Sequence, residues 1–189
     1  MTFVNPEPAK GVFWFARIAE VLGRTRRDIP LLVVEGRGRS DWVGRCGVDL
    51  SGVRSLRRMA NTADPRRFYR VSKLILMPSL VPEGLSRVAV EAMANGIPVI
   101  GSARGGLVEV LREGGVTVDI PVKHTPDTRT PPTQDEVKDW VTAIVHLWDS
   151  PSEYVRLAER AKETAAQLWH SNVLIPRWIH FLSQICKRI

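Results

Sequence analysis

Apolar residues follow two alternating patterns through residues 1–120. Short runs rich in Val, Ile and Leu predict strands, whereas longer stretches with apolar residues three or four positions apart predict helices. The run PLLVVEGRG, residues 30–38, is continuously apolar before its glycines, which indicates a strand buried on both faces. The predicted strands cover residues 2–5, 30–38, 53–58, 73–79, 97–102 and 116–120, and the predicted helices cover residues 9–24, 40–46, 65–71, 86–95 and 105–115. This alternation predicts an α/β fold, a Rossmann-like parallel sheet with helices on both faces, whose ligands bind beyond the carboxyl ends of the strands.

The pattern changes after residue 120. Residues 121–133 are rich in Pro and Thr and poor in apolar residues, which predicts an exposed loop. Thr133 with Glu136, and Ser150 with Glu153, have the spacing of capping boxes, so a helix is expected to start at each place. The two helices are expected to end near residues 148 and 168.

A last helix is predicted over residues 174–189, interrupted only at its start by Pro176. Its apolar residues recur at helical spacing: Trp178, Phe181, Leu182 and Ile185. The chain is thus expected to form one domain with a core over residues 1–120, the loop at 121–133 and a helical C-terminal tail at 134–189.

Composition narrows the class of protein. The 189 residues are 44% apolar and 25% charged, enough for one globular domain with a full core. The net charge of +7 fits either a solvated surface or an anionic partner, but no nucleic-acid-binding module accompanies it, so no nucleic acid is expected. Cys46 and Cys186 lack metal-ligand spacing, and no apolar run is long enough to span a bilayer. A cytoplasmic location is expected, with association at the inner face of the membrane left open.

Two carboxylates stand eight residues apart in the segment PEGLSRVAVEAMANGIPVI. Glu83 lies in a loop marked by Pro and Gly, and Glu91 lies inside the predicted helix, at most about 12 Å further along its axis. The N-terminus of that helix, near Ser86, offers free backbone N–H groups that suit a diphosphate. The two acids would then hold sugar hydroxyls at either side of the phosphates. Spacing alone leaves open the alternative that both are ordinary solvated glutamates.

A longer motif gives this segment an identity. The run MPSLVPEGLSRVAVEAMANGIPVIGSARGGLVEVL resembles the C-terminal, nucleotide-sugar-binding half of GT-B fold glycosyltransferases of the retaining family four, also called group 1. The resemblance includes the two acids with seven residues between them, the helix-to-strand step EAMANGIPVI and the following GG pair. Upstream, NPEPAKGVFWFARIAEVL resembles the family's opening strand, loop and KG helix. The resemblance covers about residues 2–120 closely and the helical tail loosely.

The resemblance implies roles for individual residues. Lys10 matches the lysine that contacts the donor diphosphate, and Glu83 matches the acid that binds donor-sugar hydroxyls near the anomeric carbon. These two are the expected catalytic residues, with Lys10 stabilising the departing nucleoside diphosphate. Glu91 matches the acid that holds the nucleotide ribose. The family usually has an arginine five residues before the lysine, whereas this chain has Asn5, which brings no charge.

Several further residues are expected near the donor. The family prefers an aromatic residue and then Gly where this chain has Leu85 and Ser86, although Ser suits a helix N-cap. Arg87 either adds positive charge to the site or pairs with the acid one turn further along. Gly105 and Gly106 open another helix, where they either approach the sugar or acceptor closely or form a simple turn. The expected donor-binding residues are Asn5, Gly84, Leu85, Ser86, Arg87, Glu91, Gly105 and Gly106.

The resemblance also implies what accompanies the chain. Transfer in the family is usually metal-independent, and the sequence has no D-x-D pair, so neither a metal nor a cofactor is expected besides the nucleotide-sugar donor. The family binds its acceptor on an N-terminal Rossmann-like domain, which we expect this chain to lack because it begins at what resembles the first strand of the second half. An N-terminal GT-B domain, in cis or on a partner chain, and a possible homodimer are therefore expected partners.

Three functional hypotheses follow. The first is a retaining, metal-independent glycosyltransferase domain whose base, sugar and acceptor the sequence does not identify. The second is a non-catalytic nucleotide-sugar-binding or assembly module, which Asn5 favours and the intact Lys10, Glu83 and Glu91 oppose. The third takes EGRGR as a dinucleotide fingerprint of a dehydrogenase, although it lacks a third glycine and does not follow the first strand.

Overall fold

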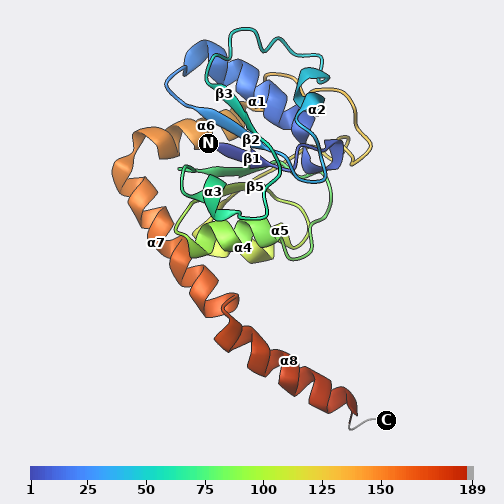
Figure 1. The fold of residues 1–189 in the computed structure, drawn as a ribbon, viewed down its shortest axis with the longest axis vertical. Coiled ribbons are helices and arrows are strands. Elements are labelled where there is room, and N and C mark those ends of the chain that lie inside the picture. Colours follow the sequence, from blue (N-terminus) through green and yellow to red (C-terminus); the bar gives the residue numbers. More distant parts are fainter. Residues whose placement is uncertain (187–189) are drawn as a thin grey trace.

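A computed structural model describes residues 1–186 of the chain. Its centre is a six-stranded, fully parallel sheet with the order β3-β2-β1-β4-β5-β6 (Figure 1). The strands are β1 (Thr2–Val4), β2 (Leu31–Val34), β3 (Leu56–Met59), β4 (Ile75–Met77), β5 (Val99–Ser102) and β6 (Val116–Val118). The predicted Rossmann-like parallel sheet is confirmed, with each strand shorter than the apolar run that predicted it.

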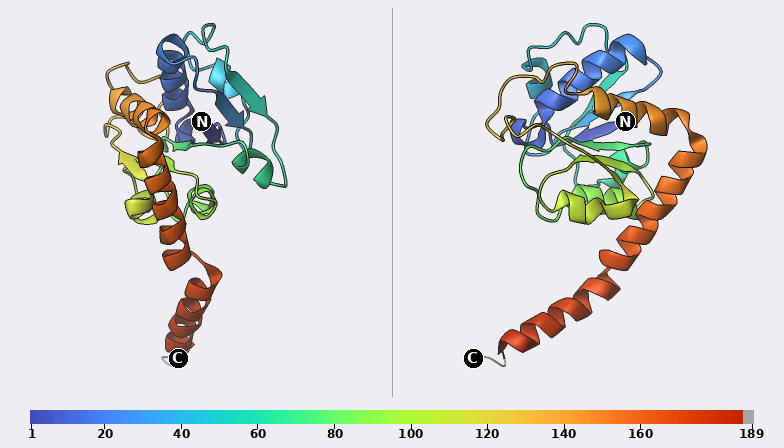
Figure 2. Two further views of the ribbon diagram at one scale, coloured as in Figure 1. Left: turned by 90° about the vertical axis from the view of Figure 1, so that its left-hand side faces the viewer. Right: turned by 180° about the vertical axis from the view of Figure 1, so that it is seen from behind.

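Helices alternate with the strands and cover both faces of the sheet (Figure 2). One face packs against α1 and α6, and the other packs against α3, α4 and α5. Helix α7 contributes to both layers, because Leu157 joins the first core cluster and Ala161 joins the second. The helices are α1 (Val12–Thr25), α2 (Asp41–Gly44), α3 (Arg66–Tyr69), α4 (Arg87–Ala94), α5 (Leu107–Leu111), α6 (Lys138–Asp149), α7 (Pro151–Leu168) and α8 (Ser171–Cys186), with short 3-10 turns η1 (Pro8–Lys10) and η2 (Arg112–Gly114).

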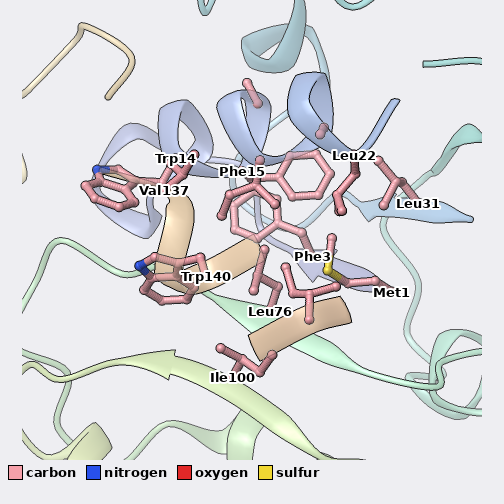
Figure 3. Close-up of a cluster of buried hydrophobic side chains, with 14 of the residues drawn as sticks. Met1, Phe3, Trp14, Phe15, Leu22, Leu31, Leu76, Ile100, Val137 and Trp140 are labelled. Atoms are coloured by element: carbon pink, nitrogen blue, oxygen red, sulfur yellow. The ribbon is translucent and has the colours of Figure 1, made fainter. Parts of the chain in front are cut away.

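The alternating direction of side chains along each strand divides the interior into two cores. The strands supply the first core with Phe3, Val33, Leu76 and Ile100, and the second with Val34, Ile75 and Val99. Figure 3 shows the first core, where Phe3 stacks on Phe15 of α1 with ring centroids 4.8 Å apart. Trp14 and Trp140 lie beside this pair and are fully buried. These large side chains fix α1 and α6 on the sheet and therefore fix the loops that leave it.

The connection from β1 to α1 is tied to the loop that follows β4. Gly11 has a φ of 82°, and a Cβ there would lie 1.8 Å from the carbonyl oxygen of Pro78. Only glycine permits this approach. The backbone N–H of Leu80 also donates to the carbonyl of Ala9 at 2.9 Å. These contacts bring Lys10 next to the segment after β4. That segment carries Glu83, which lies 73 residues after Lys10 in the sequence.

The Pro/Thr-rich loop, residues 121–133, has neither helix nor strand, as predicted. The guanidinium of Arg104 donates to the carbonyls of Leu80, Ile120, Pro121 and His124 and so holds the start of the loop against the body. His124 is buried, with Nε2 lying 3.0 Å from Glu136 Oε1. The loop therefore crosses the protein surface without being loose.

Only one of the two predicted capping boxes forms. The Thr133 N–H donates to Glu136 Oε2 at 2.7 Å, and the Glu136 N–H donates to Thr133 Oγ1 at 3.2 Å. This box closes a turn, and regular helix begins later, at Lys138. The second box was wrong: Ser150 is the N-cap of α7, but its side chain makes no capping bond, and Glu153 pairs with Arg156 instead.

Helix α8 extends away from the α/β body (Figures 1 and 2). It begins at Ser171, three residues before the predicted start, so Pro176 lies inside it. All of its described large apolar side chains are partly or largely exposed, including the predicted set Trp178, Phe181, Leu182 and Ile185. Residues 187–189 of the predicted helix lie outside the described part. Within residues 1–186, no helix is long and apolar enough to cross a membrane. The homodimer stays a prediction.

Candidate functional site

A cavity of about 330 Å³ opens at the carboxyl ends of β1 and β4, the two central strands. From β1 the chain crosses to β2 on one side, and from β4 it crosses to β5 on the other. Open α/β sheets bind their ligands at this reversal, because the loops diverge there and leave a crevice. The cavity is lined by Phe3, Val4, Asn5, Lys10, Arg37, Leu76, Met77, Ser79, Glu83, Leu85, Ser86, Arg87, Val88 and Glu91.

Glu83 lies at one wall of the cavity, and its side chain is only 11% exposed. Its Oε1 accepts a hydrogen bond from Lys10 Nζ at 2.7 Å and another from Ser79 Oγ at 2.7 Å. Charge-assisted bonds of this kind hold a carboxylate in one orientation. The structure therefore brings the two residues that were expected to be catalytic into direct contact.

The loop that carries Glu83 is braced by the two glycines at 105 and 106. Glu83 forms an isolated parallel bridge with Gly105, and the Gly106 N–H donates to the Glu83 carbonyl at 2.6 Å. A Cβ on Gly105 would lie 2.6 Å from Pro82, and one on Gly106 would lie 2.8 Å from the Gly84 carbonyl oxygen. These two glycines and Gly84 lie beside the cavity and do not line it. Their geometry is that of a support for the Glu83 loop.

Glu91 lies on the same cavity, as the fifth of the eight residues of α4. The hydroxyl of Tyr69, from α3, donates to Glu91 Oε2 at 3.0 Å. Burial and the charge of Glu91 together raise the pKa of the Tyr69 hydroxyl, so it stays protonated and remains a donor. Glu91 is therefore an oriented carboxylate, unlike a solvated residue on a helix surface.

The N-terminus of α4 lies between the two acids. Ser86 occupies the N-cap position with an extended backbone, as predicted, but its hydroxyl makes no capping bond and lies 4.0 Å from Met77 Sδ. The first N–H groups of a helix have no partner within the helix, so this end carries partial positive charge toward the cavity. Leu85 is 55% exposed at the rim. Arg87 also lines the cavity, and in the described residues no ion pair joins it to Glu91.

Asn5 lies at the end of β1 with a φ of 62°. Its side-chain Oδ1 accepts a hydrogen bond from the Gly38 N–H at 2.6 Å, which ties it to the turn after β2. Arg37, the residue before Gly38 in this turn, lines the cavity.

Three residues of this site were missed by reasoning from the sequence: Arg37, Ser79 and Tyr69. Arg37 directly follows the predicted strand that became β2, and the expectation that ligands bind beyond the carboxyl ends of strands was the available signal. That β2 lies beside β1 is seen only in the folded sheet. Ser79 stands inside the motif that carried the resemblance, but nothing in the sequence singled out its side chain. Tyr69 comes from a four-residue helix, and its contact with Glu91 depends on the packing of α3 against α4.

Within residues 1–186, no three His, Cys, Asp or Glu side chains gather in a way that would hold a metal ion. The glycines of EGRGR form the turn after β2, whereas a dinucleotide fingerprint follows the first strand of its βαβ unit. The dehydrogenase hypothesis therefore has no support from the position of this motif.

Comparison with known proteins finds glycosyltransferases among the similar sequences. The chain is 32% identical over 107 residues to D-inositol 3-phosphate glycosyltransferase of Corynebacterium kroppenstedtii, covering 55% of the chain and 20% of that protein. It is 31% identical over 122 residues to lipopolysaccharide 1,2-N-acetylglucosaminetransferase of Salmonella typhimurium, covering 57% of the chain and 30% of that enzyme. The chain thus matches less than a third of the length of either relative.

Solved structures share the fold. The Anabaena protein HepE in complex with UDP-glucose superimposes with a TM-score of 0.74 at 20% identity, over 97% of this chain and 48% of HepE. The C-terminal domain of a glycosyl transferase group 1 family protein (LpcC) from Francisella tularensis superimposes with a TM-score of 0.69 at 17% identity, over 90% of this chain and 86% of that domain. The fold is that of the C-terminal half of GT-B glycosyltransferases. Because the family model for glycosyl transferases group 1 matches residues 2–150, the chain belongs to that family.

Proposed function

We propose that the cavity binds a nucleoside-diphosphate sugar and that the chain supports transfer of that sugar to an acceptor. The observation that carries this proposal is the placement of Glu83 and Glu91 on one cavity with the N-terminus of α4 between them. Hydroxyl groups of sugars bind carboxylates, and phosphates bind the positive end of a helix. The ligand consists of a sugar, a diphosphate and a ribose in that order. Along the cavity wall, Glu83, the N-terminus of α4 and Glu91 follow one another in the matching order.

Lys10 is proposed to act on both the sugar end and the phosphates. An ammonium group has three N–H donors, and only one of them is needed for Glu83 Oε1. The remaining donors can bind oxygens of the diphosphate, whose negative charge increases as the bond to the sugar breaks. A cation placed at that point lowers the barrier because it stabilises charge that develops in the transition state.

Glu91 is proposed to bind the ribose of the nucleotide. Its second oxygen, Oε1, has no hydrogen bond among the described residues, while Tyr69 fixes Oε2. An acceptor oriented in this way suits the paired hydroxyls of a ribose. The retaining, metal-independent course of the reaction and the need for an acceptor-binding N-terminal domain rest on the resemblance of residues 77–111 to the retaining family. The neighbour HepE, of which this chain covers 48%, supports the need for a further domain.

The test is calorimetric titration of the folded 189-residue chain with UDP-glucose first, since HepE binds it, and then with GDP and ADP sugars. Glu91→Gln is expected to lower the affinity for both the nucleotide sugar and its free nucleoside diphosphate by about tenfold, because it removes the charge of one hydrogen-bond acceptor. Glu83→Gln is expected to weaken only the nucleotide sugar. The free diphosphate should bind equally well or better, because Lys10 loses its carboxylate partner.

Glu159→Gln is the matched control, because Glu159 is exposed on α7, away from the cavity. It should leave every affinity unchanged. A folded wild-type chain that binds none of the nucleotide sugars contradicts the proposal. The non-catalytic module remains the second candidate because Asn5 brings no charge. Slow hydrolysis of the bound donor that is lost in Glu83→Gln would separate the enzyme from the module.

A further inference from the structure

The cavity contains three cationic side chains, Lys10, Arg37 and Arg87, and two anionic ones, Glu83 and Glu91. Lys10 is already paired with Glu83 at 2.7 Å. Asn5, at the end of β1, contributes no charge, and its amide oxygen is engaged by the Gly38 N–H. On the wall formed by the loops after β1 and β2, Arg37 is therefore the cation that has no ion-pair partner among residues 1–186, whereas Lys10 shares its charge with Glu83.

Arg37 is presented by a turn that is held at several points. The Gly36 N–H donates to the Gly38 carbonyl at 3.1 Å, and Asn5 Oδ1 accepts from the Gly38 N–H at 2.6 Å. On the far side, Glu35 Oε1 accepts from both the N–H and the hydroxyl of Ser40, at 2.9 and 2.7 Å. The backbone of Arg37 is thus fixed between two clamps.

Both neighbours of Arg37 must be glycine for the turn to pack this closely. A Cβ on Gly36 would lie 2.8 Å from Asn5 Oδ1, and a Cβ on Gly38 would lie 2.5 Å from Glu7 Cγ and 2.7 Å from the Pro6 carbonyl oxygen. The side chain of Arg37, in contrast, is exposed and makes no hydrogen bond or ion pair with any of residues 1–186. A fixed backbone with an uncommitted guanidinium suits a residue that binds a ligand anion, because the turn needs no further ordering and no ion pair has to be broken first.

The geometry points to Arg37 as a donor-phosphate-binding residue, with Asn5 as the positioning residue that holds its turn at the cavity. This inference rests on the proposed function, because it assumes that the cavity takes a nucleoside diphosphate. It assigns to the loop after β2 a positive charge beside Asn5, which brings none, and in addition to that of Lys10. Arginine suits the role because its planar fork can bind two phosphate oxygens at once.

The experiment compares nucleoside diphosphates with nucleosides, so that contacts to phosphate are isolated. Titrations of the full chain use UDP, GDP and ADP, each against its own nucleoside. For the diphosphate that binds, Arg37→Ala should weaken affinity by about tenfold, whereas the nucleoside should bind as it does to wild type. The salt dependence of diphosphate binding should also become shallower in this variant. Arg39→Ala is the matched control, because Arg39 is exposed in the same turn but does not line the cavity.

The role of Asn5 is tested by Asn5→Gly, which keeps a residue that tolerates the positive φ and removes the acceptor for Gly38. As a single substitution, it should lower the affinity for the diphosphate by about threefold. In the Arg37→Ala background it should have no further effect on that affinity. Additive losses would overturn the positioning role of Asn5. Diphosphate affinity unchanged in Arg37→Ala would overturn the inference while leaving the proposed function intact. A wild-type chain that binds no diphosphate or nucleotide sugar would instead overturn the proposed function, and this inference with it.

Discussion

The α/β body, residues 1–169, and helix α8 use the same kinds of apolar side chain in opposite ways. In the body, Trp14 is fully buried against Trp140 and His124. In α8, Trp178 is 59% exposed and contacts Phe181, which is itself 52% exposed. Burial of an apolar side chain stabilises a fold only to the extent that water is removed from it. The body therefore holds the cavity in place, and α8 contributes little to that rigidity.

Replacing one tryptophan in each region by alanine should give the largest difference in the free energy of unfolding. Trp14→Ala is expected to lower the free energy of unfolding by about 3–5 kcal/mol, because it leaves a cavity between α1 and α6. Its Nε1 has no hydrogen-bond partner among residues 1–186, so no hydrogen bond is lost with the ring. Trp178→Ala should change the free energy by less than about 0.5 kcal/mol. Urea unfolding followed by circular dichroism measures both.

If Trp14→Ala does not fold, Trp14→Phe keeps an aromatic ring and should still cost more than Trp178→Ala. Equal losses in the two regions would show that α8 packs against the body in solution, contrary to the exposure of Trp178 and Phe181.

Acid should act on the body through Glu136. Burial raises the pKa of this carboxyl group, but hydrogen bonds from Lys123, the Thr133 backbone and His124 outweigh burial and lower it to about 2. A carboxyl group with a lowered pKa stabilises the fold above its ordinary pKa of about 4.5, and that stability is lost as pH falls toward 2. After allowance for solvent screening, we expect a loss of about 1–2 kcal/mol.

The measurement is urea unfolding at a series of pH values between 5 and about 2.5, within the window set by these pKa values. Glu136→Gln should flatten the profile in that range, whereas Glu159→Gln, on the exposed face of α7, should keep it. A Glu136→Gln profile that falls as steeply as that of wild type would contradict the prediction.

The sequence predicted the body far better than it predicted the site's contacts. The parallel sheet and its two helical layers follow from the alternation of apolar patterns, which depends on local spacing alone. The predicted positions of Glu83 in a loop, Ser86 at a helix N-cap and Glu91 inside that helix are confirmed, because all three belong to one loop and the helix after it. The pairing of Lys10 with Glu83 joins residues 73 apart, and no local pattern carries that information.

Arg37 and Tyr69 were missed for the same reason. Arg37 reaches the cavity, and Tyr69 reaches Glu91, from elements that come next to the site only in the folded protein. The behaviour of α8 was also beyond the sequence, because helical spacing of apolar residues predicts an apolar face but does not tell what that face contacts. For Asn5, the sequence shows that the residue has no charge. Its hydrogen bond with Gly38 could not be predicted, because that bond depends on the conformation of the turn after β2.

Removing α8 should have a small effect on the body. A chain that ends at His170 is expected to have a free energy of unfolding within about 0.5 kcal/mol of that of the full chain, because none of the described residues of α8 is buried. It should also keep the same affinity for the nucleotide sugar, since every residue that lines the cavity precedes position 92. Denaturant unfolding and calorimetry test these two expectations separately. A large loss of stability on truncation would mean that α8 folds back onto the body in solution.

The two cysteines allow the same contrast to be measured without changing stability at all. Cys46 is buried, its Sγ lies 3.1 Å from the Trp42 carbonyl oxygen, and burial raises the pKa of its thiol to about 12. Cys186, at the end of α8, is exposed. Because the thiolate is the reactive form, a disulfide-exchange reagent should label one thiol of the folded chain quickly and the second only in urea. Cys186→Ala should remove the fast phase and leave the slow one. Rapid labelling of both thiols in the folded chain would mean that the segment around Cys46 opens often, and the body would then be less uniformly rigid than its buried tryptophans imply.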